Sequence, residues 1–508
     1  MAKRSMIVVF VHGWSVTNTA TYGGLPARLR NEAVARELDV QVKHVFLGRY
    51  ISFHDEVRLP DVSRAFRTAV ADELQSLLTG GKRFVCITHS TGGPVIRDWW
   101  HRYYDGVKGS GVCPMSHLIM LAPANYGSAL AQLGKGRISR LKSWFGGVEP
   151  GQGVLDWLEL GSSEAWDLNS AWIDNGDNRI AANGIFPFVL TGQTIDRKFY
   201  DNLNSYTGES GSDGVVRVAA ANLHGRLIGL EQQAPRRKPG NKSGLVAPQL
   251  QVTRVATGPE TVLRIIRGAS HSGSRKGIMR SVKVKANHTQ GRDVVDAIFD
   301  CLAVSNRAEY RKLAKTHISE AAAIQTDEML ETEDRLLLSD THFVHDRYSM
   351  VIFRVRDDHN YPVPDFDLLL TGGKDNDPNK LPKGFFMDRQ LNRVSRDTVT
   401  YFFNYDIMAG APEVKKGDDV IRAATHGVEA LGIKILPRPA SGFVHYLNCE
   451  IQASQELLNE VLRPNCTTMI DIRLRRVVKK NVFRLQRMQG DSTSGNFKKT
   501  RPGDNFVS

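Results

Sequence analysis

Short apolar runs alternate with amphipathic stretches over the first 300 residues of the chain. Apolar runs of this length, bounded by turn residues, are typical of strands buried in a parallel sheet, and the stretches between them have helical spacing. One such stretch, residues 61–78, is expected to be a helix capped by Asp61. The pattern predicts an α/β fold, a mostly parallel sheet with helices on both faces. We expect its strands at 7–11, 40–47, 84–88, 118–121, 186–190 and 262–266.

Two changes of pattern divide the chain. Residues 125–183 lose the regular alternation, and an insertion of that length often forms a cap over a hydrolase active site, although its apolar residues could equally pack onto the sheet. From residue 341 the apolar runs become strand-like and turns separate them, which suits an antiparallel β-sandwich-like domain. The predicted organisation is a catalytic domain at 1–290, a helical connector at 291–340, a β-rich domain at 341–480 and a disordered tail at 481–508.

Composition narrows the class of protein. The 508 residues contain five scattered cysteines without a C-x-x-C pair, which argues against a disulfide framework and a zinc site. The first residues contain no recognisable signal peptide, and no apolar stretch is long enough for a membrane span, so we expect synthesis in the cytoplasm. A net charge of +13 favours anionic partners such as phospholipid surfaces.

The strongest chemical signal is the segment Thr88-His89-Ser90-Thr91-Gly92, which follows the strand predicted at 84–88. A serine in a tight turn between a strand and a helix is the nucleophile elbow of α/β-hydrolases, where small flanking residues let the hydroxyl stand at the sheet edge. Gly92 fits the second glycine of the G-x-S-x-G pattern and Thr88 replaces the first. Ser90 is therefore the predicted nucleophile.

A second signal follows the first predicted strand, where His12-Gly13-Trp14 begins a loop. In this fold the backbone N–H of the residue after the nucleophile and an N–H from such a loop form the oxyanion hole. The expected donors are Trp14 and Thr91, and His12 is expected to be structural.

The remaining members of a catalytic triad come later in the chain. Asp213, in Ser212-Asp213-Gly214, is the predicted acid, with Asp196 as the alternative. His271 follows the last predicted strand on a loop of small residues and is the predicted general base. The order Ser90, Asp213, His271 is the order expected for an α/β-hydrolase fold.

These motifs, together with Leu121-Ala122-Pro123-Ala124-Asn125-Tyr126-Gly127-Ser128, resemble those of the α/β-hydrolase lipases over residues 6–280. The resemblance is to the group that contains lecithin:cholesterol acyltransferase-like and GPI inositol-deacylase-like enzymes. It implies a serine esterase acting on lipid or phospholipid esters without a cofactor. The plan is also similar to that of phospholipase effectors of type VI secretion, which implies export without a signal peptide.

Alternatives remain at this stage. The same triad serves an acyltransferase, since the sequence does not reveal which alcohol or water enters second. A hydrolase fold can also persist in a non-catalytic binding protein, with the β-rich domain engaging a protein partner. A nucleic-acid partner is not expected because no recognition motif is present. Acidic turn residues such as Asp357 and Asp375 suit calcium or simple surface turns, and we expect no metal.

Overall fold

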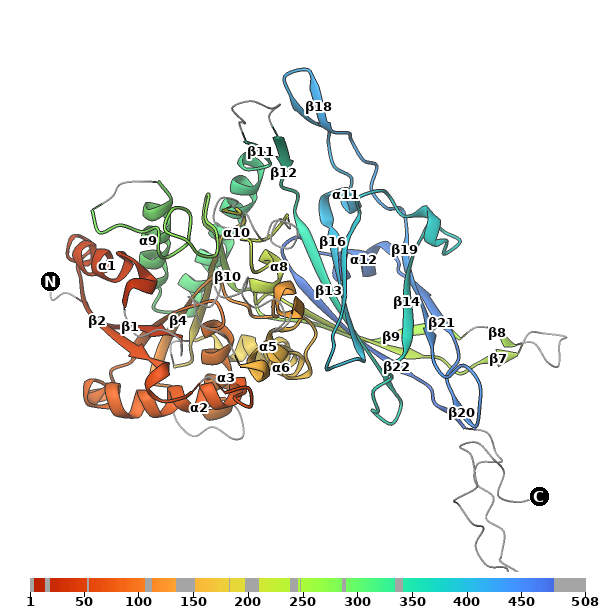
Figure 1. The fold of residues 1–508 in the computed structure, drawn as a ribbon, viewed down its shortest axis with the longest axis horizontal. Coiled ribbons are helices and arrows are strands. Elements are labelled where there is room, and N and C mark those ends of the chain that lie inside the picture. The colour runs from red at the N-terminus through yellow and green to blue at the C-terminus, as the bar shows by residue number, and fades with distance from the viewer. Residues whose placement is uncertain are drawn as a thin grey trace, which may run out of the picture.

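The fold is seen in a computed structural model that describes residues 4–478 except for several short segments (Figure 1). The segments outside the description are 1–3, 14–18, 53, 106–111, 134–150, 182, 197–209, 238–244, 247, 286–288, 334–340 and 479–508. The predicted tail at 481–508 and the predicted donor Trp14 therefore lie outside the described residues.

The first sheet has six parallel strands in the order β10-β5-β4-β3-β1-β2. All six coincide with runs predicted from the sequence, because apolar side chains fill both faces of a covered parallel sheet. The expected α/β fold is confirmed. The strands are β1 (Arg4–His12), β2 (Leu38–Phe46), β3 (Phe84–His89), β4 (Met115–Leu121), β5 (Phe186–Thr191) and β10 (Val262–Ile265).

Helices cover both faces of the first sheet, with α1 and α9 above it and α2 and α3 below it in Figure 1. The helix predicted to begin at Asp61 starts earlier, because Pro60 occupies its first turn and the Asp61 carboxylate accepts a hydrogen bond from the Arg58 N–H at 3.0 Å. Asp61 therefore completes a capping box from the third helical position instead of capping the helix itself. The helices are α1 (Leu25–Ala33), α2 (Leu59–Ala69), α3 (Gly92–Tyr104), α9 (Thr289–Ala303) and α10 (Arg307–Asp327).

A second sheet of six strands fills the other half of the molecule, in the order β15-β16-β13-β22-β6-β9. Its three central strands β13, β22 and β6 run parallel and the outer pairs are antiparallel, so the sheet is mixed. The strands are β6 (Arg226–Gln232), β9 (Leu250–Thr257), β13 (Tyr348–Asp357), β15 (Phe386–Leu391), β16 (Thr398–Asn404) and β22 (Thr467–Leu474). Two of them, β6 and β9, come from the stretch between β5 and β10 of the first sheet.

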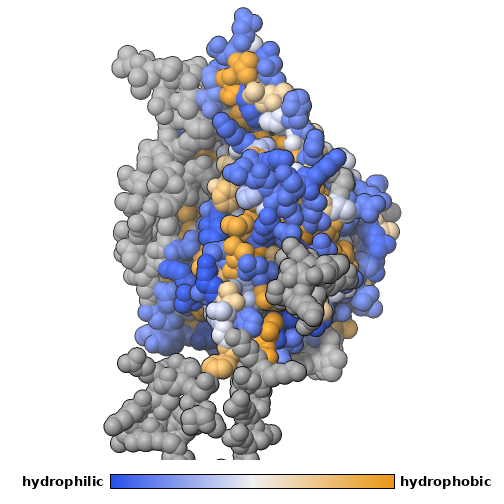
Figure 2. All heavy atoms as spheres, turned by 90° about the vertical axis from the view of Figure 1, so that its right-hand side faces the viewer, coloured by the Kyte–Doolittle hydropathy of each residue, from blue (hydrophilic) through white to orange (hydrophobic). Residues whose placement is uncertain are grey.

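The inner strands of the second sheet, such as β13 and β16, are buried on both faces. One face joins the large core of the first sheet through Tyr348, Met350 and Phe402, among others. The opposite face packs on a separate core together with a three-stranded antiparallel sheet, β14 (Phe366–Gly372), β19 (Leu431–Pro437) and β21 (Cys449–Gln452). The expected additional β-structure near the C-terminus is thus present. Seen from the right-hand side of Figure 1, the surface carries a narrow band of hydrophobic side chains between hydrophilic ones (Figure 2).

The described part of the 125–183 insertion packs between the two sheets. It contains η8 (Ala129–Leu133), α5 (Gln152–Leu158) and α6 (Ser163–Arg179). Trp166 of α6 lies under the Arg354 guanidinium of β13, 4.1 Å away, and the Thr398 hydroxyl of β16 donates to the Gly161 carbonyl at 2.7 Å. The Trp172 ring packs at a tilt against Trp100 of α3, with ring centroids 5.8 Å apart. The described tryptophans of α6 therefore act as packing between the sheets.

Candidate active site

Ser90 stands on a strained turn at the carboxyl end of β3. Its φ is +53°, a left-handed conformation that non-glycine residues rarely adopt, and its N–H donates to the Leu121 carbonyl of β4 at 3.0 Å. The chain turns directly into α3, whose N-cap is Thr91. This strand, turn and helix have the nucleophile-elbow arrangement predicted from the sequence.

The structure brings Ser90, His271 and Asp213 into one hydrogen-bonded row. His271 Nε2 lies 3.0 Å from Ser90 Oγ, and His271 Nδ1 lies 2.9 Å from Asp213 Oδ2. A carboxylate only accepts, so Nδ1–H is the donor to Asp213, and in the neutral ring Nε2 is left to accept from the Ser90 hydroxyl. The row has the geometry in which an imidazole takes the proton of a serine.

Backbone hydrogen bonds hold the Asp213 carboxylate in place. Its Oδ1 accepts from the N–H groups of Val215 at 3.0 Å and Val216 at 2.8 Å, which leaves Oδ2 for His271. Asp213 and His271 are both completely buried, and Ser90 is 8% exposed. A carboxylate satisfied in this way can stay buried and still fix the orientation of the imidazole.

The alternative acid, Asp196, does not contact His271 in this arrangement. It is buried and its Oδ1 accepts from the Arg275 guanidinium at 3.1 Å. Asp196 therefore contributes an ion pair to the neighbouring loop, and Asp213 is the acid that faces the histidine.

His89, which the sequence analysis did not single out, supports the loop of His271. Its Nε2 donates to the His271 carbonyl at 3.0 Å, and the two rings lie 4.7 Å apart. Burial lowers the pKa of His89 well below its ordinary value, and the adjacent His271 acts in the same direction. A neutral ring with its proton on Nε2 is the form that this contact requires. Only its position next to Ser90 could have drawn attention to it.

Of the two predicted oxyanion donors, Thr91 lies within the described residues. It occupies the N-cap position of α3, where backbone N–H groups lack intrahelical acceptors and the helix dipole favours negative charge. His12 is buried at the end of β1 with its Nε2 2.9 Å from His44 Nδ1. Burial lowers the pKa of His12 to about 3, so its ring is neutral and suits the structural role expected for it.

No group of three or more potential metal-ligating His, Cys, Asp or Glu side chains occurs in the described parts of the chain. The acidic turn residues Asp357 and Asp375 of the β-rich region contact other residues of this chain. Asp375 pairs with Lys380 at 2.9 Å, and the Asp357 carboxylate accepts from the His359 and Tyr361 N–H groups at 3.0 and 2.8 Å. These contacts are those of turns between strands.

Solved structures of one protein match almost the entire chain. The phospholipase PlaB from Legionella pneumophila is 42% identical, with 97% of each chain covered and a TM-score of 0.81. The same protein in complex with thio-NAD matches at 41% identity, again with 97% of each chain covered, and a TM-score of 0.80. No protein-family model and no curated protein matches the chain.

Proposed function

Because the chain belongs to the family of the phospholipase PlaB, we propose that it is a phospholipase that cleaves carboxylic esters of phospholipids with Ser90 as nucleophile. The observation that carries the proposal is the hydrogen-bonded row of Ser90, His271 and Asp213 at 3.0 and 2.9 Å. These three side chains supply the nucleophile, the general base and the acid that lipid-ester hydrolysis requires.

The first half of the proposed reaction forms an acyl-enzyme. His271 Nε2 takes the proton of Ser90 as Oγ attacks the ester carbonyl, and the Asp213 carboxylate stabilises the resulting imidazolium. The oxyanion is held by the N–H of Thr91 and by that of Trp14, whose role stays a prediction. The ester C–O bond then breaks, and the leaving alcohol receives the proton from His271.

The second half regenerates the serine. Water enters, gives its proton to His271 and attacks the acyl carbonyl, after which the fatty acid leaves and Ser90 Oγ recovers the proton. Every atom and charge is accounted for by the substrate, water and these side chains. No further group is needed for the reaction.

The substrate of such an enzyme lies in a bilayer, so we propose peripheral contact with a membrane surface. None of the helices within the described residues is long and apolar enough to cross a membrane. The net charge of +13 would draw the protein towards anionic lipids over a distance of about a Debye length, roughly 10 Å at 0.1 M salt. Delivery by type VI secretion and a protein partner of the β-rich region stay predictions.

The experiment compares wild type, Ser90→Ala and Ser116→Ala on a mixed phospholipid and on short- and long-chain p-nitrophenyl esters. Ser116 is the second residue of β4, at the amino end of that strand, whereas Ser90 follows the carboxyl end of the parallel strand β3, so Ser116→Ala is a matched control. We expect Ser90→Ala to lose turnover by on the order of 10⁶-fold, as triad serines do, and the control to keep it. Unchanged activity in Ser90→Ala would refute the proposal.

Chromatography of the products with and without an added lipid alcohol identifies the acceptor in the second half. Free fatty acid in both conditions supports hydrolysis. Transfer of the acyl chain to the alcohol would identify an acyltransferase that uses the same row of residues.

A further inference from the structure

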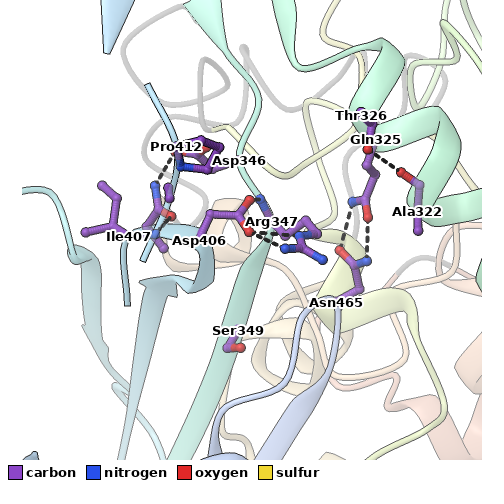
Figure 3. Close-up of polar contacts among 12 residues, drawn as sticks. Ala322, Gln325, Thr326, Asp346, Arg347, Ser349, Asp406, Ile407, Pro412 and Asn465 are labelled. Atoms are coloured by element: carbon purple, nitrogen blue, oxygen red, sulfur yellow. Dashed lines mark hydrogen bonds and ion pairs between the residues drawn. The ribbon is translucent and has the colours of Figure 1, made fainter. Parts of the chain in front are cut away.

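A chain of hydrogen bonds runs from the second sheet to the loop that carries His271. It begins at Asn465, two residues before β22. Asn465 exchanges two hydrogen bonds with Gln325 of α10 (Figure 3). Asn465 Nδ2 donates to Gln325 Oε1 at 2.8 Å, and Gln325 Nε2 donates to Asn465 Oδ1 at 3.0 Å. Paired amides of this kind hold α10 against the second sheet at this point.

The chain continues through two further residues. Gln325 Nε2 also donates to Gln193 Oε1 at 3.2 Å, and Gln193 Nε2 donates to Glu328 Oε2 at 2.7 Å. The other oxygen, Glu328 Oε1, accepts from the backbone N–H of Gly268 at 2.7 Å. The Glu328 carboxylate thus accepts hydrogen bonds from both Gln193 and Gly268. An amide in its place would direct its own NH₂ group at one of these two donors.

Gly268 lies three residues after the end of β10, near the start of the loop that carries His271. Its φ is +64°, a conformation that favours glycine, so the direction of the loop depends on this residue. The next residue, Ala269, accepts from the Thr194 N–H at 3.1 Å, and the His271 N–H donates to the Asp213 carbonyl at 2.9 Å. Glu328, the C-cap residue of α10, therefore holds the backbone at the start of this loop, three residues before His271.

The two glutamines in the middle of the chain are buried, with Gln193 5% and Gln325 6% exposed. A buried polar side chain that lost its partner would leave an unsatisfied group away from water, so the network tends to hold one arrangement. The network links the second sheet mechanically to the catalytic loop.

We propose that Glu328 is a positioning residue for His271. The side-chain amides of Gln193, Gln325 and Asn465 link Glu328 to the second sheet through hydrogen bonds. This inference rests on the proposed function, because it concerns the histidine of that mechanism. It also assigns the second sheet a part in catalysis, which is to keep the imidazole aligned with Ser90.

The principal test measures kcat and KM on a long-chain p-nitrophenyl ester for Glu328→Gln and Glu328→Ala. A displaced base slows the chemical step, and misplacement by about 1 Å can lower the rate by about 10²-fold, so we expect kcat to fall between 10- and about 100-fold while KM stays within about twofold. Glu328→Gln keeps one acceptor and is expected to lose less. Glu328 borders an open pocket of ≈ 270 Å³, so water can take the place of the carboxylate in Glu328→Ala and the variant is expected to fold.

The adjacent carboxylate provides a matched control. Asp327 pairs with Arg267 on the surface at 2.8 Å, and that contact does not involve the backbone of the loop. Asp327→Asn removes the same charge one residue away, and we expect its kcat to stay within about twofold of wild type, as for most surface substitutions. An equal loss of kcat in Asp327→Asn and Glu328→Gln would point to charge alone and overturn the inference.

The remote end of the network is tested with Asn465→Gly. Asn465 has a φ of +60°, so glycine keeps the backbone conformation while it removes the side-chain amide, whereas alanine would add strain. We expect a smaller fall in kcat without a change in KM. In Glu328→Ala/Asn465→Gly the fall should equal that of Glu328→Ala alone, because both act through one chain of contacts.

The outcomes separate this inference from the proposed function. If Ser90→Ala abolishes activity while Glu328→Ala keeps kcat within twofold, the positioning role is wrong and the proposed function stands. If Ser90→Ala stays active, the proposed function itself fails. Thermal unfolding of each variant accompanies the kinetics, and should Glu328→Ala unfold, the comparison of Glu328→Gln with Asp327→Asn decides the question.

Discussion

The hydroxyl oxygen of Thr88 lies 1.8 Å from the point that a Cβ atom at residue 92 would occupy, so Gly92 is required by its neighbour Thr88. Thr88 fills the place of the first glycine in the nucleophile-elbow pattern. Its hydroxyl is buried and has no hydrogen-bond partner among the described residues. The turn around Ser90 therefore accommodates a larger first residue only because the second one is glycine.

This relationship predicts a rescue between the two positions. Gly92→Ala should destabilise the turn by about 1–3 kcal/mol, as overpacking does, and should lower kcat because Ser90 shifts. Thr88→Gly/Gly92→Ala should recover most of the activity, since the colliding hydroxyl is gone. The measurement is kcat together with urea unfolding of the two single variants and the double variant. A double variant no better than Gly92→Ala would show that something other than Thr88 excludes a side chain there.

The choice of acid is tested by two matched substitutions. Asp213→Asn should lower kcat by about 10⁴-fold, because an amide at this position favours the wrong tautomer of His271. Asp196→Asn removes the charge of the buried pair with Arg275 and leaves the contact of Asp213 with His271 in place, so its kcat should stay far above that of Asp213→Asn. Kinetics of both variants on one ester substrate are sufficient. A larger loss in Asp196→Asn than in Asp213→Asn would reverse the assignment.

His117, in β4 and remote from Ser90, predicts a dependence of stability on pH. Its Nε2 donates to the Val304 carbonyl at 2.9 Å, and burial lowers the pKa of His117 from 6.5 to about 4. The unfolded chain therefore binds the proton more strongly, and stability that is fully present above pH 6.5 is lost as the pH falls towards 4. By this linkage the free energy of unfolding should drop by about 2 kcal/mol between pH 7 and pH 5 through this residue alone.

The comparison that isolates this contribution is His117→Gln, which cannot take up the proton. Urea unfolding at pH 7 and pH 5 should show that the variant loses about 2 kcal/mol less than wild type over this interval, the value expected from linkage. His12 and His89 are also buried and neutral, so they contribute the same change of unfolding free energy with pH in wild type and in His117→Gln. Equal losses in the two proteins would mean that His117 is not buried as a neutral ring.

The docking of the insertion on the second sheet depends on a buried carboxylate. Glu159 is 2% exposed and accepts from the Arg393 N–H at 2.8 Å and from Arg393 Nε at 3.0 Å. Arg393→Ala should lower the free energy of unfolding by about 1.5–3 kcal/mol, because the buried charge loses its charged donor. Adding Glu159→Gln should relieve part of this loss, which a double-mutant cycle by urea unfolding measures. Strictly additive effects would contradict a direct pair.

The sequence alone predicted the six strands of the first sheet and the three residues Ser90, Asp213 and His271 that the structure brings within hydrogen-bond distance. These features are local. A buried parallel strand shows as an apolar run, and a nucleophile elbow shows as small residues at fixed positions around a serine. Their catalytic roles remain the proposal that the Ser90 experiment tests.

The tertiary structure alone decided features that depend on contacts distant in sequence. β6 pairs with β22, so residues 226–231 join a strand near the C-terminus, and no local pattern indicates such a partner. Glu328, Gln193 and Asn465 are common polar residues whose significance appears only when folding brings them to one loop. Local periodicity reports which face of an element is buried, whereas pairing across 242 residues, as between Arg226 and Thr468, depends on the whole chain being packed.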